Sequence, residues 1–143
     1  MNHDSIALLQ DCNSGTKTAL QSFQDVMDHV KSSDLHDLLV HSMEVHESIG
    51  NEAKTLLHAQ DVPGKDPSLM ARAASWLKVN AELLNENSDR TIADLITDGC
   101  NMGIKSLSAS FNKYPDADDC VKKLADRIRI EEDDLLQKLR IYL

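Results

Sequence analysis

The sequence predicts an all-α protein built from four long helices and one short crossover helix, in a single domain spanning residues 1–143. Apolar residues recur at steps of three and four along most of the chain, which is the spacing of one helix face. Only 3 % of the residues are aromatic in a chain that is 41 % hydrophobic. The core must therefore consist mainly of aliphatic side chains, which suit helix packing better than sheets. No stretch alternates with the period of a strand.

The first two helices are predicted over residues 4–31 and 35–60, with Asp4 as the cap of the first. The short polar segment 32–34 favours a turn, and so short a link makes the two helices antiparallel neighbours. The predicted inward faces are Ile6, Leu9, Asn13, Thr16, Leu20, Phe23, Met27 and Val30 on the first helix, and Leu35, Leu39, Ser42, His46, Ile49, Ala53 and Leu56 on the second.

Residues 61–67 form the clearest break, since two prolines and a glycine fall within seven positions. A short helix is predicted over residues 67–84, and the two remaining long helices over 90–114 and 117–143. The predicted inward residues of these last two helices are Ile92, Ile96, Ile104, Leu107 and Phe111, followed by Val121, Leu124, Ile128, Leu135, Leu139 and Tyr142.

Charge and cysteine content exclude several classes of protein. The formal net charge is −9, and no basic stripe appears, which argues against nucleic acid and anionic membrane surfaces as partners. No apolar stretch approaches the roughly 18 residues that a membrane span needs. Three cysteines without a signal peptide favour reduced thiols, so we expect a cytoplasmic location.

Two segments 88 residues apart resemble one another. Residues 12–23 and 100–111 share six identities in twelve positions, including Gly15 with Gly103 and Phe23 with Phe111. We interpret this as duplication of a helical hairpin, in which two copies joined by a long crossover close into a bundle. The two hairpins should then superpose. The glycines are expected to let another helix approach closely.

The helix order, residues 98–105 and residues 75–78 together resemble the ferritin-like superfamily, in particular its small uncharacterised bacterial members. The resemblance covers nearly the whole chain. It implies a ferritin-like four-helix bundle of two antiparallel hairpins with a short crossover helix between them. Active members hold two metal ions with one Glu on each of helices one and four, and a Glu-x-x-His pair on each partner helix.

The resemblance places the two single-Glu positions at Thr16 and Ile104, or at Cys100 in a shifted register. None of these is a carboxylate. On the second helix the pair falls on Met43 and His46, so only the His remains. Glu44 and Glu47 would serve in another register, but helical geometry turns Glu44 away from the face that holds His46.

The offset of 88 residues carries this pair to Glu131 and Asp134 on the last helix. The surviving candidate metal ligands are therefore His46, Glu131 and Asp134. Because a buried polar group needs a partner, we expect His46 and Glu131 to lie close together near mid-bundle. The ordinary alternative for His46 is a hydrogen-bonded core residue, and the outward members of the acidic run 131–134 are expected to be a solvated face.

For the other polar or reactive positions, structural roles are the main expectation. Asn13 and Thr16 are expected to fix helix register. Cys12 and Cys100 occupy equivalent places and are either a redox pair or two small buried hydrophobes. Trp76 is expected to plug the bundle or mark a dimer surface.

We interpret the protein as a non-catalytic or vestigial ferritin-like protein, acting as a structural or partner-binding module without a di-iron centre. Its partner would be another protein or a second copy in a homo-oligomer such as a dimer. The alternative is a di-metal iron or manganese oxidase, peroxidase or storage protein of the rubrerythrin type with a rearranged site. A third reading is a stress-related oligomer of the Dps kind. The sequence lacks a phosphate-binding glycine loop, a nucleophilic serine elbow and a Cys-x-x-Cys pair.

Overall fold

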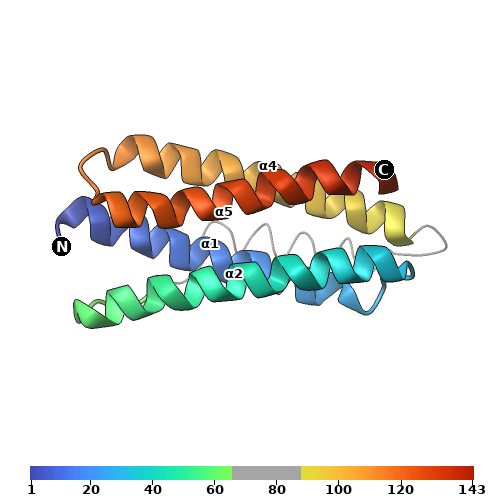
Figure 1. Ribbon diagram of the computed structural model, residues 1–143, viewed down its shortest axis with the longest axis horizontal. Helices are drawn as coiled ribbons and strands as arrows, with labels where there is room; N and C mark the ends of the chain where they lie inside the picture. The colour runs from blue at the N-terminus through green and yellow to red at the C-terminus, as the bar shows by residue number, and fades with distance from the viewer. Residues whose placement is uncertain (66–87) are drawn as a thin grey trace.

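The computed structural model describes residues 1–65 and 88–143, which form four long α-helices in two antiparallel hairpins (Figure 1). The first hairpin pairs α1 (His3–Met27) with α2 (Ser33–Ala59), and the second pairs α4 (Ser88–Lys113) with α5 (Asp119–Lys138). A short 3₁₀ turn, η1 (Leu139–Tyr142), follows α5. The predicted all-α class and four long helices are confirmed. The predicted crossover helix over residues 67–84, with Trp76, lies outside the described residues.

The cap of α1 differs from the predicted one. The side chain of Asn2, not of Asp4, accepts the backbone N–H of Ser5 at 2.8 Å. Asp4 instead accepts the backbone N–H of Asp116 at 3.1 Å, which joins the start of α1 to the loop between α4 and α5. Ser32 caps α2 by accepting the N–H of Leu35. Short polar side chains thus satisfy amide groups that a helix leaves free in its first turn.

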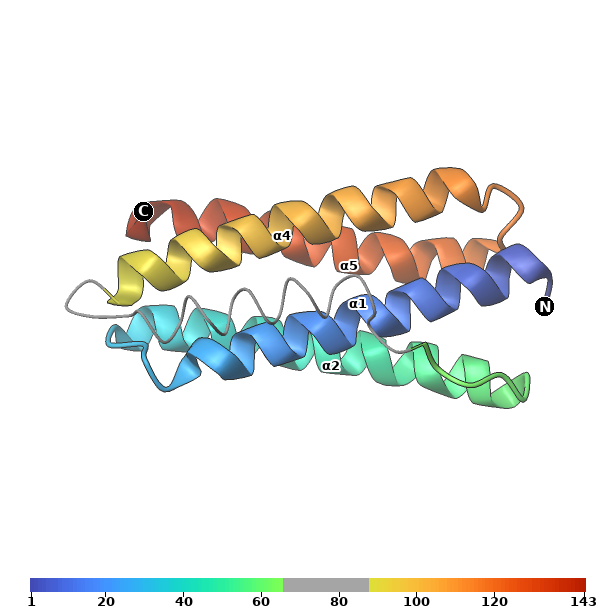
Figure 2. The same cartoon turned by 180° about the vertical axis from the view of Figure 1, so that it is seen from behind.

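Each helix of one hairpin lies beside a helix of the other. α1 contacts α4, and α2 contacts α5. In Figures 1 and 2 both of these pairs run antiparallel, and α2 ends at the opposite end of the bundle from the start of α4. None of the helices in the described ranges is long and apolar enough to cross a membrane.

The interior contains two clusters of buried apolar side chains. One includes Phe23, Leu35 and Cys100, and the other includes Cys12 and Leu124, with Phe111 packed against it. Cys12 and Phe23 of α1 therefore belong to opposite clusters from their repeat partners on α4. A twofold axis perpendicular to the bundle would exchange the ends of α1 and α4 in this way.

A close contact between α1 and α2 depends on Gly50 and not on Gly15, for which a close helix contact was predicted. A Cβ atom at Gly50 of α2 would lie 2.6 Å from Oγ1 of Thr16 on α1. At Gly15, no other described atom lies within 4 Å of the corresponding position, so the expected close helix contact is absent there. The hydroxyl of Thr16 is bonded to the carbonyls of Cys12 and Asn13, both at 3.0 Å, and cannot move without losing those contacts.

We predict opposite effects for two glycine-to-alanine changes, measured by urea unfolding. Gly50→Ala should lower the free energy of unfolding by about 1–3 kcal/mol because its methyl group overpacks against Thr16. Gly99→Ala should raise it by about 0.5–1 kcal/mol, since Gly99 lies in exposed helix with open space around it. Equal effects from the two changes would contradict the close contact between α1 and α2.

Candidate functional site

A histidine and a glutamate meet in the interior of the bundle. His46 comes from α2 and Glu132 from α5, and their side chains are only 1 % and 8 % exposed. Nε2 of His46 lies 3.5 Å from Oε1 of Glu132. A pair of ionisable groups so well shielded from water is rare unless the two groups stabilise each other.

The two residues occupy equivalent positions on their helices. The buried stripe of α2 recurs on α5 at a constant offset of 86 residues, through the pairs Leu35 and Val121, Leu39 and Ala125, Ser42 and Ile128, His46 and Glu132, and Ile49 and Leu135. The helices themselves begin 86 residues apart, at Ser33 and Asp119. The offset is thus two residues smaller than the 88 residues that relate α1 to α4.

This difference explains why Glu131 was the wrong prediction for the inward carboxylate. Carrying the offset of 88 from α1 and α4 onto α2 and α5 selects the wrong residues, because a shift of two positions turns a helix face by about 200°. Glu131 is half-buried and Asp134 is exposed, where it pairs with Lys138 at 2.7 Å. His46 is buried as predicted, but its partner is Glu132. Comparing the apolar stripes of the two helices directly would have found this register.

The ring of His46 is fixed on both sides. Its Nδ1 lies 2.8 Å from the backbone carbonyl of Ser42, one turn earlier, and can only donate a hydrogen to that oxygen. The ring of Phe23 contacts it edge-on, with 5.4 Å between ring centroids. With the proton of Nδ1 held in this way, Nε2 faces the carboxylate of Glu132. Two acceptors would repel each other there, so the pair must share one further proton.

The pKa values of both groups reflect this shared proton. Burial lowers the pKa of His46, but the contact with the Glu132 carboxylate and the bond to Ser42 outweigh burial, so the pKa lies above its ordinary value of 6.5. Burial raises the pKa of Glu132 above 4.5, and His46 opposes that rise only in part. The folded pair therefore holds its proton more tightly than the same groups do in the unfolded chain.

The second oxygen of Glu132 has a different environment. Oε2 finds no hydrogen-bond partner within the described part of the chain. It lies over Gly103 of α4, where a Cβ atom would be 2.9 Å from the Cδ of Glu132 and would clash with both oxygens. Gly103 thus allows a close approach, as expected, but the group that approaches is the carboxylate of Glu132 and not the backbone of another helix.

The remaining predicted polar positions are structural. Asn13 and Thr16 are buried, and the Thr16 hydroxyl bonds to carbonyls of its own helix. Cys12 and Cys100 are buried free thiols. Burial raises the pKa of Cys12 to about 12, and burial also raises the pKa of Cys100 well above its ordinary value. Thiolate is therefore scarce at neutral pH, which favours the reading of both as small hydrophobes.

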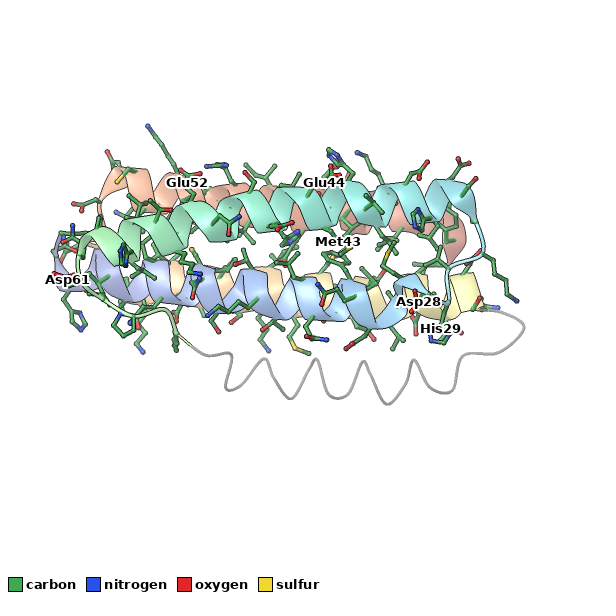
Figure 3. The ribbon with its side chains drawn as sticks, turned by 90° about the horizontal axis from the view of Figure 1, so that it is seen from below. Asp28, His29, Met43, Glu44, Glu52 and Asp61 are labelled. Carbon is green, nitrogen blue, oxygen red and sulfur yellow. The ribbon has the colours of Figure 1, made fainter. Side chains whose placement is uncertain are left out.

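The donor set around the pair does not fit a di-metal centre. Across residues 1–65 and 88–143, no three His, Cys, Asp or Glu side chains are grouped so that they could hold a metal ion. Met43 packs against the apolar core, and Figure 3 shows it between α2 and α1, with Glu44 on the outer side of α2. Divalent iron and manganese prefer several oxygen ligands, and a single carboxylate beside one imidazole does not supply them.

The fold and the buried pair together define an all-α four-helix protein with a polar centre. Its structure is similar to a crystal structure described as a DUF305 fragment from Deinococcus radiodurans, with a TM-score of 0.78 and 14 % sequence identity. The match covers 97 % of this chain and 94 % of that chain. At this identity the likeness shows the fold alone. No family model and no curated protein matches the sequence.

We predict a strong coupling between His46 and Glu132 in a double-mutant cycle. His46→Leu or Glu132→Leu alone should each lower the free energy of unfolding by about 3–5 kcal/mol at pH 7, because each leaves the other group buried without a partner. The double variant should be close to wild type in stability. Chemical denaturation of the four proteins measures the coupling, and additive losses would contradict it.

The same four proteins also give the pH dependence. Because the folded pKa values of both groups are raised, the native state binds more protons than the unfolded state. The stabilisation from His46 is complete below its ordinary pKa of 6.5 and is lost as the pH rises through the folded pKa. Wild-type stability should therefore fall above pH 6.5, and the double variant should lack that fall.

Proposed function

We propose that this protein is a ferritin-like bundle without a di-metal centre, and that it acts as a structural or partner-binding module. The observation that carries the proposal is the pairing of His46 with Glu132. These residues occupy equivalent positions in the two hairpins, where a ferritin-like protein would direct metal ligands inward. Here the two side chains face each other instead, with 3.5 Å between Nε2 of His46 and Oε1 of Glu132.

Three features support the ferritin-like assignment. The two hairpins lie with α1 antiparallel to α4 and α2 antiparallel to α5. The sequences of α1 and α4 repeat at 88 residues, and the buried stripes of α2 and α5 repeat at 86. The repeat partners on α1 and α4 lie in opposite apolar clusters. Duplication of a hairpin, followed by closure about a twofold axis, accounts for all three.

The offset of 86 residues between α2 and α5 leaves fewer candidate metal ligands than the offset of 88 residues suggested. With an offset of 86, the partner of Met43 is Arg129. Its guanidinium lies over the ring of Phe111, 4.5 Å from the ring centroid, and pairs with Asp126. A permanently positive side chain at a ligand position opposes the binding of divalent cations. Thr16 and Ile104 contribute no negative charge either.

We predict that the purified protein does not retain two metal ions per chain after loading with iron or manganese and removal of unbound metal. Elemental analysis by mass spectrometry gives the stoichiometry. His46→Leu is the matched control, and it should leave the metal content unchanged. Two tightly held ions per wild-type chain, lost in His46→Leu, would contradict the proposal and favour a di-metal oxidase or storage protein.

The best-placed surface for a partner is the outer face of α2 and α5. A groove there is lined by Val45 of α2 and by Ile130 of α5, and Ile130 is 66 % exposed. Charges of both signs surround it, since Arg127 and Glu131 also contribute to its wall. An apolar centre with mixed charges at its margin suits an isologous contact between two copies of the chain.

We predict that the chain associates with itself through this face. Ile130→Ser should weaken the association, as measured by sedimentation velocity over a range of protein concentrations, because it removes apolar area from the centre of the contact. Ile141→Ser is the matched control, since Ile141 is 83 % exposed but lies in η1 away from the groove. A wild-type chain that stays monomeric would contradict this part of the proposal.

A further inference from the structure

Glu132 has one buried oxygen without a partner, and the same residue lines a cavity of about 260 Å³ between α1 and α4. Ser14 and Gly15 of α1 form one side of the cavity, and Gly103 and Ser106 of α4 form the other. Small residues on both helices leave the space open. Glu132 itself is 6 % exposed, so its carboxylate is almost wholly buried at the inner wall of the cavity.

Among the polar groups that line this cavity, Oε2 of Glu132 is an acceptor that has no donor in the described part of the chain. A carboxylate oxygen can only accept while ionised, and the serine hydroxyls can accept as well as donate. Leu107 and Ile128 add apolar wall beside them. An acceptor at the inner end and an apolar lining suit a short hydrocarbon chain that carries an N–H donor at one end.

The cationic side chains of the cavity wall are already engaged. Nζ of Lys65 contacts Asp11 at 2.7 Å, and Nζ of Lys113 lies over the ring of Tyr114, 5.3 Å from its centroid. Lys65 shows that a primary ammonium group is accommodated at this wall. Neither lysine is recorded as a partner of Glu132, whose Oε2 remains unsatisfied among the described residues.

We propose that this cavity binds a short primary alkylammonium ion, with the ammonium group donating to Oε2 of Glu132 and the alkyl chain against Leu107 and Ile128. The net charge of −9 raises the local concentration of such cations. This site is independent of the proposed partner-binding role, since it lies between α1 and α4 and not on the face of α2 and α5.

Binding is coupled to the proton that His46 and Glu132 share. A cation at Oε2 neutralises the carboxylate from its other side and weakens the attraction that keeps His46 protonated. The bound cation therefore lowers the pKa of His46, and by linkage the affinity for the cation rises with pH. The other titratable groups facing Glu132 are Cys100 on α4 and Glu131 on α5, and the cavity wall adds Asp11, Lys65, Lys113 and Tyr114.

The test is a titration of the full chain with propylammonium chloride, followed by NMR of the Gly103 amide and the His46 ring. Tetramethylammonium chloride at the same ionic strength is the control, because it carries the same charge without an N–H donor. Propylammonium should give saturable shifts at both residues, and tetramethylammonium should not. The apparent affinity for propylammonium should increase as the pH rises above 6.5, because the pKa of His46 lies above that ordinary value.

Two variants locate the site. Glu132→Gln keeps the shape of the side chain and removes its charge, so it should weaken binding at least about tenfold, the usual value of a charge-assisted hydrogen bond. Gly103→Ala should weaken binding similarly, because its methyl group displaces the carboxylate. Gly99→Ala, in open space on the same helix, should bind as wild type does. Circular dichroism establishes that each variant is folded.

Three results would overturn the proposal. Shifts that do not saturate would show that the cavity has no specific site. Equal shifts with tetramethylammonium would show a general ionic effect. Unchanged affinity in Glu132→Gln, with its fold intact, would show that the carboxylate of Glu132 is not the ligand.

Discussion

One shared proton between His46 and Glu132 is the constraint that organises the middle of this bundle. The carbonyl of Ser42 holds the hydrogen of Nδ1, so the other ring nitrogen must face the carboxylate at 3.5 Å. Neither an isolated carboxylate nor an isolated imidazolium is tolerated at such burial. Because His46 lies on α2 and Glu132 on α5, satisfying them together requires the two hairpins to meet in one register.

The side chains packed around His46 and Glu132 satisfy the same constraint. Apolar clusters lie around the polar centre and keep water from the pair, which strengthens the interaction and makes its loss more damaging. The ring of Phe23 closes one side of His46, and Gly103 leaves the space that the Glu132 carboxylate fills. Residues from all four helices therefore determine the position of a single proton.

The pair also connects the proposed functions to the fold. In a ferritin-like arrangement the same inward positions would carry metal ligands, whereas here Thr16, Ile104 and Arg129 cannot balance the charge of two cations. The likeness to the DUF305 fragment extends over nearly the whole of both chains, but at 14 % identity it transfers architecture and not chemistry. The polar groups left at the centre are the two oxygens of Glu132, of which Oε1 faces His46 and Oε2 lies beside Gly103.

The sequence by itself determined the four long helices, their approximate ends and most of their inward faces, because a period of three to four residues is a local property of the side-chain pattern. It also placed His46 in the core. The partner of His46 was harder to predict, since Glu131 and Glu132 both follow Ile128 at core spacing. The offset of 88 pointed to Glu131, and burial in the folded chain shows that Glu132 is the partner. The cavity beside Gly15 was likewise decided by tertiary structure. A glycine can allow close approach or leave a gap, and the position of the opposite helix decides which occurs.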